Sequence, residues 1–227
     1  MSARPSPKFV QFDCYGTLIQ WNEGLERTFA GILRDKNSPA DPAHFRDTVK
    51  KLAHGQLKTG YRPYKSILGD SLRQALQSLG LRYEESDAQR LLAAIPMFPA
   101  YPEVREAMER IARVSKLALI SNTDDDLLPG SLKQIVVSFD LVTTAERARA
   151  YKPTEAIFRY ALERMGCAPA EIVHVAAGWW TDIEPATKLG LPKVWINRRG
   201  ERGDAACRPY GELPDLSGLP DLLGMPR

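Results

Sequence analysis

The sequence predicts an α/β fold in which helices cover a parallel sheet, with a block of helices inserted after the first strand. Two observations lead to this prediction. Apolar runs typical of strands alternate with helical patterns in the second half of the chain. Before that alternation, only helical patterns follow the first apolar run. Strand–helix alternation indicates a parallel sheet with helices on both faces.

The elements follow in order from the apolar spacing. The first strand is the run K-F-V-Q-F, which ends at Asp13. Helices are then predicted at 22–36, 43–57, 65–79 and 84–95, and three prolines end this block (Pro96, Pro99, Pro102). Further helices near 103–113, 126–136, 154–166 and 181–189 alternate with strands at 116–120, 139–142, 171–175 and 193–196. This pattern predicts a Rossmann-like core, residues 1–20 and 100–227, with a helical cap domain at 21–99.

The composition excludes several classes of function. The 227 residues are 44% hydrophobic and 26% charged with a net charge of +3, and the charges are interspersed, so no nucleic-acid or membrane partner is expected. No apolar run reaches the roughly 18 residues of a membrane span. The amino terminus lacks a secretory signal, which predicts a cytoplasmic protein. The cysteines and histidines show neither disulfide nor metal-ligand spacing (Cys14, Cys167, Cys207, His44, His54, His174).

Polar side chains follow four of the predicted strands. Asp13 ends the first strand, and Ser121 and Asn122 end the strand at 116–120. Lys152 follows the 139–142 strand, and Asp182 follows the 171–175 strand. Ligands of open parallel sheets bind beyond the carboxyl ends of the strands. The sequence therefore predicts a site at this edge of the sheet.

These motifs resemble those of the haloacid dehalogenase superfamily: D-x-x-G-T, then S/T-N, then K-P, then a small-residue loop that ends in an acid. The resemblance covers nearly the whole chain. It implies that Asp13 is a nucleophile that forms a covalent ester. It also implies that Lys152 keeps Asp13 ionised and that Thr17 fixes the second carboxylate oxygen. The anion of the substrate would bind to Ser121, Asn122 and the turn formed by Cys14, Tyr15 and Gly16.

Two positions argue against the phosphatases of the superfamily. Their second acid, two residues after the nucleophile, is Tyr15 here, which supplies a proton poorly near neutral pH. The first acid of their magnesium loop is Ala177 here, which leaves only Asp182. The resemblance therefore favours the 2-haloacid dehalogenases, which carry D-x-Y-G-T-L and use no metal. No cofactor is expected.

The resemblance to the dehalogenases implies a two-step reaction on a small carboxylate substrate. Asp13 would displace the leaving group from C2 of a short 2-substituted carboxylic acid. Water would then hydrolyse the aspartyl ester to a 2-hydroxy acid, with Asp182 as the base, assisted by Lys152. Related enzymes are often homodimers, so a homodimer is one expected assembly.

The chain also departs from those dehalogenases. Their Ser and Asn in the 171–182 loop are Ala176 and Gly178 here, and the loop is one residue longer before the acid. A tyrosine after the K-P motif is replaced by Phe158. Further substrate contacts are expected from Trp179 and Trp180, which would form an apolar wall, and from Trp21 at the entrance to the site. A cation of the cap, Arg46 or Arg62, would receive the leaving group.

Three alternatives stay open at this stage. A strained ring amine such as azetidine-2-carboxylate presents the same C2 centre beside a carboxylate, and the tryptophans would favour its charge. A magnesium-dependent phosphatase is less favoured. A non-catalytic binding protein is a third alternative, whose mark would be loss of Asp13 or Lys152; both are present.

Overall fold

The protein is described by a computed structural model that covers residues 7–226. Its sheet has six parallel strands in the order β3-β2-β1-β4-β5-β6. These strands are β1 (Phe9–Asp13), β2 (Lys116–Ser121), β3 (Leu141–Thr144), β4 (Ile172–Ala176), β5 (Lys193–Ile196) and β6 (Gly211–Leu213). The predicted α/β fold class is confirmed.

Helices cover both faces of the sheet. On one face, apolar side chains of β1 and β2 such as Val10 and Leu119 pack with α5 (Val104–Ala112), α6 (Leu128–Ile135) and α10 (Leu219–Leu222). On the other face, Phe9 and Ile120 pack with α8 (Glu155–Met165) and α9 (Glu184–Lys188). The short helix α7 (Ala145–Ala148) precedes α8. Alternate residues of each strand thus contact opposite helical layers, as the period of two requires.

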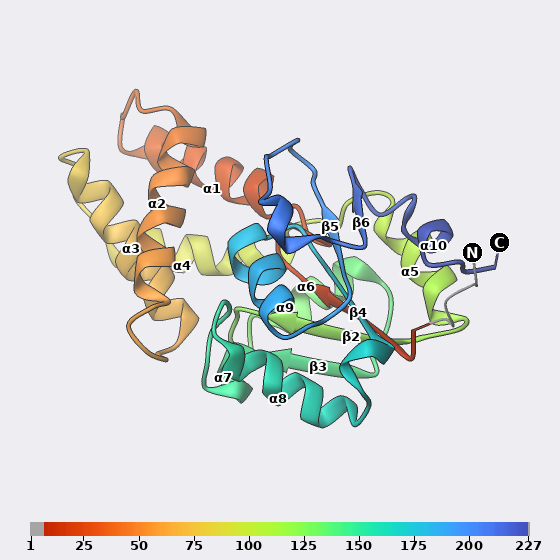
Figure 1. The fold of residues 1–227 in the computed structure, drawn as a ribbon. Helices are drawn as coiled ribbons and strands as arrows, with labels where there is room; N and C mark the ends of the chain where they lie inside the picture. The colour runs from red at the N-terminus through yellow and green to blue at the C-terminus, as the bar shows by residue number, and fades with distance from the viewer. Residues whose placement is uncertain (1–6, 227) are drawn as a thin grey trace.

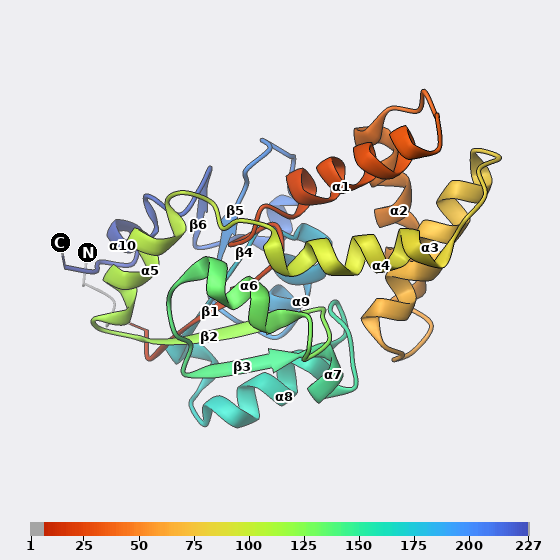
Figure 2. The same ribbon diagram turned by 180° about the vertical axis from the view of Figure 1, so that it is seen from behind.

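Four helices lie between β1 and α5 in the chain and to one side of the sheet in space (Figures 1 and 2). They are α1 (Trp21–Asp35), α2 (Pro42–Gln56), α3 (Tyr64–Ser78) and α4 (Glu85–Ala94). We call this group the cap helices. The division at residues 20/21 and 99/100 stays a prediction. None of the helices formed by residues 7–226 combines the length and apolar character that crossing a membrane requires.

Several elements differ from the sequence prediction, among them the short helices α7 and α10, which were not predicted, and α6, which begins at Leu128 rather than near residue 126. Strand β3 begins two residues later than predicted, because Asp140 instead turns the chain by accepting a hydrogen bond from the backbone N–H of Leu117. Strand β6 was not predicted, since three half-exposed residues give no apolar pattern. The helix predicted near 181–189 begins only at Glu184, because residues 179–183 form a π-helical turn.

A side chain of the core accepts the free N–H groups at the N-terminus of helix α3. The N-cap residue Pro63 has no side-chain hydrogen bond to offer. Both oxygens of Asp124, in the loop after β2, instead accept the backbone N–H groups of Tyr64 and Lys65 at 2.8 Å. Asp124 is 2% exposed. This buried carboxylate therefore joins the cap helices to the sheet.

Replacing Asp124 by Ala is expected to lower the free energy of unfolding by about 1–3 kcal/mol, because two helix N–H groups lose a charged acceptor. Asp126→Ala is the matched control, since its ion pair with Lys65 is exposed and contributes about 0–1 kcal/mol. Urea unfolding of both variants measures the difference. Equal stability of the two variants would contradict the assigned role.

Candidate active site

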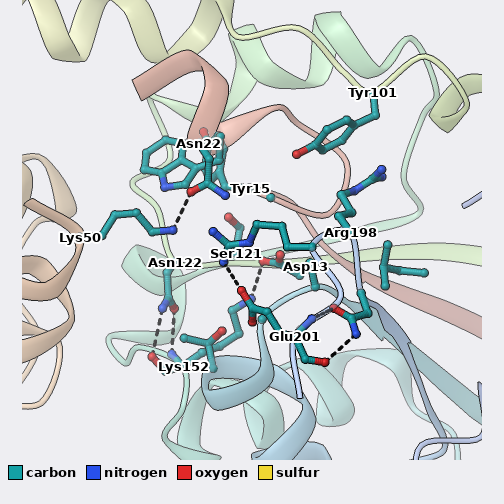
Figure 3. A pocket seen from close by; sticks show the side chains of 18 of the residues that line it. Asp13, Tyr15, Asn22, Lys50, Tyr101, Ser121, Asn122, Lys152, Arg198 and Glu201 are labelled. Atoms are coloured by element: carbon teal, nitrogen blue, oxygen red, sulfur yellow. Dashed lines mark hydrogen bonds and ion pairs between the residues drawn. The ribbon is translucent and has the colours of Figure 1, made fainter. Parts of the chain in front are cut away.

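Four of the five polar side chains predicted at the strand ends line one cavity, and the fifth, Asp182, lies behind Lys152. The cavity has a volume of about 400 Å³ and lies between the carboxyl edge of the sheet and the cap helices. Figure 3 shows five of the predicted residues together at this cavity, all from the core: Asp13, Tyr15, Ser121, Asn122 and Lys152. Parallel strands bring their carboxyl ends to one edge, which is why residues more than 100 positions apart in the chain become neighbours.

Asp13 is held at both carboxylate oxygens. Lys152 Nζ lies 2.6 Å from Oδ1, and the hydroxyl of Thr17 donates to Oδ2 at 2.7 Å. The Thr17 hydroxyl in turn accepts the backbone N–H of Ala177 at 2.9 Å, so its proton is directed to Asp13. Gly16 allows the turn between the two, since its φ of +92° lies in the region that favours glycine. The carboxylate is therefore fixed in one orientation at the cavity.

Lys152 bridges two carboxylates. Its Nζ donates to Asp13 Oδ1, to Asp182 Oδ1 at 2.7 Å and to the carbonyl of Ile120 at 3.3 Å, and the side chain is 2% exposed. All three ammonium protons thus have acceptors. The side-chain amide of Asn122 holds the Lys152 backbone at both ends: Oδ1 accepts its N–H at 2.8 Å, and Nδ2 donates to its carbonyl at 3.0 Å.

Asp13, Lys152 and Asp182 change one another's pKa values. Burial raises the pKa of Asp13, and the nearby Asp182 charge adds to this effect, while Lys152 opposes it. Burial alone would also raise the pKa of Asp182, but Lys152 and His174 lower it to about 2. Burial disfavours the charged form of Lys152, yet the two carboxylates raise its pKa overall. At neutral pH the lysine is therefore a stable cation beside a desolvated carboxylate.

Ser121 and Tyr15 also line the cavity. The hydroxyl of Ser121 is buried and has no hydrogen-bond partner among the described residues. Buried hydroxyls without a partner are rare, so this one is poised to bind a ligand atom. The Tyr15 hydroxyl instead lies 3.1 Å from Ser131 Oγ, and burial raises the pKa of this phenol.

The comparisons with known proteins agree with this geometry. The family model of the haloacid dehalogenase-like hydrolases matches residues 7–190. The chain belongs to this family. Two relatives match over 93% of the chain: (S)-2-haloacid dehalogenase 1 of Pseudomonas sp. (strain CBS-3), 26% identical over 94% of its length, and (S)-2-haloacid dehalogenase 4A of Burkholderia cepacia, 27% identical over 93% of its length. The protein is therefore a hydrolase.

Solved structures of the family share the fold. An L-2-haloacid dehalogenase from Xanthobacter autotrophicus with chloropropionic acid covalently bound has a TM-score of 0.84 at 20% identity, covering 96% of this chain and 98% of that one. The family hydrolase YfnB from Bacillus subtilis, bound to magnesium, also has a TM-score of 0.84 at 15% identity, covering 97% and 100%. Because both structures fit equally well, the fold alone does not select the reaction.

The side chains of this haloacid dehalogenase-like hydrolase do not fit a magnesium ion. Magnesium prefers about six oxygen ligands in an octahedron. The chain has Tyr15 and Ala177 where the magnesium motif places acids, and both oxygens of Asp182 already accept hydrogen bonds, from Lys152, His174 and Thr181. Within residues 7–226, no group of three or more His, Cys, Asp or Glu side chains is arranged to bind a metal.

The loop after β4 leads into the π-helical turn Trp179–Ile183. The backbone N–H of Ile183 bonds to the carbonyl of Gly178, five residues back. A Cβ at Gly178 would lie 2.6 Å from Asp182 Oδ2, so this close approach requires glycine. The turn places Asp182 against Lys152.

Several predicted contacts are not made in this member of the family. Arg46 does not line the cavity, because it pairs with Glu26 at 2.6 Å and with Asp47 at 2.9 Å. Arg62 likewise does not line the cavity, because it forms an ion pair with Asp70 at 2.7 Å. Neither arginine is therefore placed to receive a leaving group.

The predicted turn and aromatic contacts are met only in part. The side chain of Cys14 lies in the core, fully buried, and the N–H of Gly16 donates to the carbonyl of Ile19, which leaves it unavailable to a substrate. Trp21 does line the cavity. Trp179 packs on Trp195, and Trp180 packs on His54. Both of these tryptophans line a neighbouring hollow of about 770 Å³ rather than the cavity at Asp13.

The structure adds residues that the sequence did not single out. Lys50, one helical turn after Arg46 on α2, reaches the cavity from the cap side, where its Nζ donates to Asn22 Oδ1 at 2.6 Å (Figure 3). Arg198 stabilises the turn between Asp13 and Thr17, since its Nη2 donates to the Thr17 carbonyl at 2.7 Å. The i,i+4 spacing from Arg46 was the one signal that could have pointed to Lys50.

Proposed function

We propose that this enzyme cleaves the carbon–halogen bond at C2 of a small 2-halocarboxylic acid through an aspartyl ester on Asp13, without metal or organic cofactor. One observation carries the proposal: a desolvated carboxylate is aimed into the cavity by Lys152 and Thr17. No second acid stands at position 15 to protonate an alkoxide. A halide leaves without a proton, so this machinery is sufficient for it.

In the first step, an oxygen of Asp13 forms a bond to C2 while the carbon–halogen bond breaks and the halide leaves with the electron pair. The substrate carboxylate needs donors beside the nucleophile. The unpartnered hydroxyl of Ser121 is one such donor. Besides the substrate contact expected of it, the Asn122 amide keeps the Lys152 backbone in place. Fixed donors of this kind lower the barrier without reorganisation.

In the second step, water adds to the ester carbonyl carbon, and collapse of the tetrahedral adduct regenerates Asp13, releases the 2-hydroxy acid and gives one proton to solvent. While the ester exists, Asp13 carries no charge. Asp182 is then the buried counter-ion of Lys152, and its pKa of about 2 keeps it ionised. The geometry favours this role over that of base, because both Asp182 oxygens are engaged and the residue is 1% exposed.

Lys50 is the proposed cation for the leaving group. Within residues 7–226 it has no carboxylate within ion-pair distance, and it faces the cavity from the cap side. Burial and the nearby Arg199 charge lower its pKa to about 8. This value also favours a second candidate reaction, the ring opening of a strained cyclic amino acid such as azetidine-2-carboxylate, because Lys50 could give a proton to the departing nitrogen.

Replacing Lys50 by Met is expected to lower kcat about ten- to a hundredfold, because the departing group loses a charged partner. In the unmodified enzyme, activity should fall as the pH rises through about 8 and Lys50 loses its proton. Steady-state kinetics against pH measure both effects. Lys51→Met is the matched control, since Lys51 is exposed on the same helix; equal losses in the two variants would rule out the role.

A substrate panel tests the proposed function. It contains L- and D-2-chloropropionate, azetidine-2-carboxylate and p-nitrophenyl phosphate, with halide, ring-opened product and phosphate measured separately. We expect halide release that EDTA leaves unchanged and, in single-turnover reactions in oxygen-18 water, a first product whose new oxygen comes from the enzyme. Hydrolysis of the phosphate ester alone, dependent on magnesium, would overturn the proposal.

A further inference from the structure

A histidine lies behind the carboxylate–lysine cluster and outside the cavity. His174 is in the middle of β4, paired in register with Gln11 of β1 and Lys193 of β5, and it is 0% exposed. Its ring faces the helical layer of α8, where it packs edge-on against Phe158 with ring centroids 5.5 Å apart. An imidazole in such a place is costly unless its nitrogens are hydrogen-bonded.

Both ring nitrogens have partners. Nδ1 lies 3.0 Å from Gln11 Oε1, and Nε2 lies 3.1 Å from Asp182 Oδ1. A carboxylate oxygen only accepts hydrogen bonds, so Nε2 carries the proton that joins the histidine to Asp182. Gln11 suits either charge state of the ring, because its amide can accept from Nδ1–H or, rotated, donate to a bare Nδ1.

The same Asp182 oxygen accepts a hydrogen bond from Lys152 at 2.7 Å, and Lys152 lies 2.6 Å from Asp13. A continuous buried chain therefore runs from His174 through Asp182 and Lys152 to the nucleophile. The Asp182 carboxylate, together with Asp13 and the Ile120 carbonyl, holds the ammonium group of Lys152 in place. His174 and Thr181 between them fix the orientation of the Asp182 carboxylate, one at each oxygen.

From this geometry we infer that His174 is a positioning residue for the second step of the reaction, acting through Asp182 on Lys152. The inference rests on the proposed function, since it requires an ester on Asp13. With the ester formed, Asp182 is the only member of the chain that still balances the Lys152 charge. Ester hydrolysis then depends on the Asp182 orientation more than alkylation does, because during alkylation Asp13 also holds the lysine.

The histidine contributes through one hydrogen-bond donor, and a pair of variants isolates that donor. Gln and Met have side chains of similar length and flexibility, but only Gln can donate to Asp182. We expect His174→Met to hydrolyse the ester roughly ten- to hundredfold more slowly, the range for loss of a hydrogen bond to a charged group. The covalent adduct should then accumulate in intact-mass spectra, with KM for 2-chloropropionate little changed or lower. His174→Gln should restore most of the rate.

The outcomes separate this inference from the proposed function. If the unmodified enzyme shows no adduct and no halide release, the proposed function fails, whatever the variants do. If it does form the adduct and the Gln and Met variants hydrolyse it equally fast, or equally slowly, the inference is wrong. Circular dichroism checks that each variant is folded. Should the Met variant fail to fold, His174→Asn replaces it, because its amide is one carbon too short to reach Asp182.

Discussion

Asp13→Asn is expected to release halide from 2-chloropropionate at least about a thousandfold more slowly than the unmodified enzyme. The neutral amide keeps the shape of the side chain but lacks the charge of the nucleophile. Lys152 and Thr17 would still surround it, so the loss measures the carboxylate itself. Halide release and intact-mass spectrometry during turnover provide the measurement.

The same substitution is expected to leave the protein as stable as before, or more stable. Burial raises the pKa of Asp13 in the folded protein. A carboxyl group whose pKa is higher in the folded than in the unfolded state makes the protein less stable as the pH rises from the unfolded pKa through the folded pKa. At neutral pH the charge of Asp13 therefore costs stability. Asp126→Asn, at an exposed acid, should change neither activity nor stability. A covalent adduct on the Asp13→Asn variant, or activity within tenfold of normal, would contradict the assignment of the nucleophile.

The sequence predicted the core of the fold because its strands are buried. Strand β1 has five buried residues and ends at Asp13, so the apolar run and the strand coincide. Strand β6 was missed because its Gly-Glu-Leu run is half-exposed at the edge of the sheet. Its position depends on pairing with β5, which the local sequence does not encode.

The candidate site was predictable where it depends on the sheet alone. The cluster of Asp13, Lys152 and Asp182 follows from the shared edge of parallel strands. The cap contribution depends on tertiary packing instead. Arg46 and Lys50 are one helical turn apart on α2, and the side chains of α1 distinguish them: Glu26 pairs with Arg46, whereas Asn22, at the cavity, accepts a hydrogen bond from Lys50.

His174 was overlooked for a different reason. Its spacing from the other histidines predicts no metal site, and a single histidine within an apolar strand carries no motif of its own. Alternation along β1 and β4 places Gln11, Asp13 and His174 on the same face of the sheet, so strand periodicity carried a usable signal. What the sequence could not give is the π-helical turn that brings Asp182 back within 3.1 Å of the imidazole.

Lys152→Met is expected to abolish turnover and also to lower the free energy of unfolding by about 3–5 kcal/mol at neutral pH. Its removal leaves Asp13 and Asp182 buried together with no cation between them. Burial and mutual repulsion then raise the pKa of both acids, so folding of the variant favours their protonated forms.

This expectation has a definite dependence on pH. In the unmodified protein, the lowered pKa of Asp182 adds stability above its unfolded value of 3.8, and this is lost as the pH falls through about 2. In the variant, raised carboxylate pKa values add a penalty that grows as the pH rises above that unfolded value. The stability difference should therefore be larger near pH 7 than at about pH 5, as urea unfolding at the two values would measure.

A double variant separates the charge imbalance from loss of packing. Adding Asp182→Asn to Lys152→Met removes one of the two carboxylates that share the site, so part of the lost stability should return at neutral pH. Activity should stay absent, because no cation stands beside Asp13. If the single variant were as stable as the unmodified protein near pH 7, or if the double variant were no more stable than the single one, the ammonium group would not be balancing two buried charges.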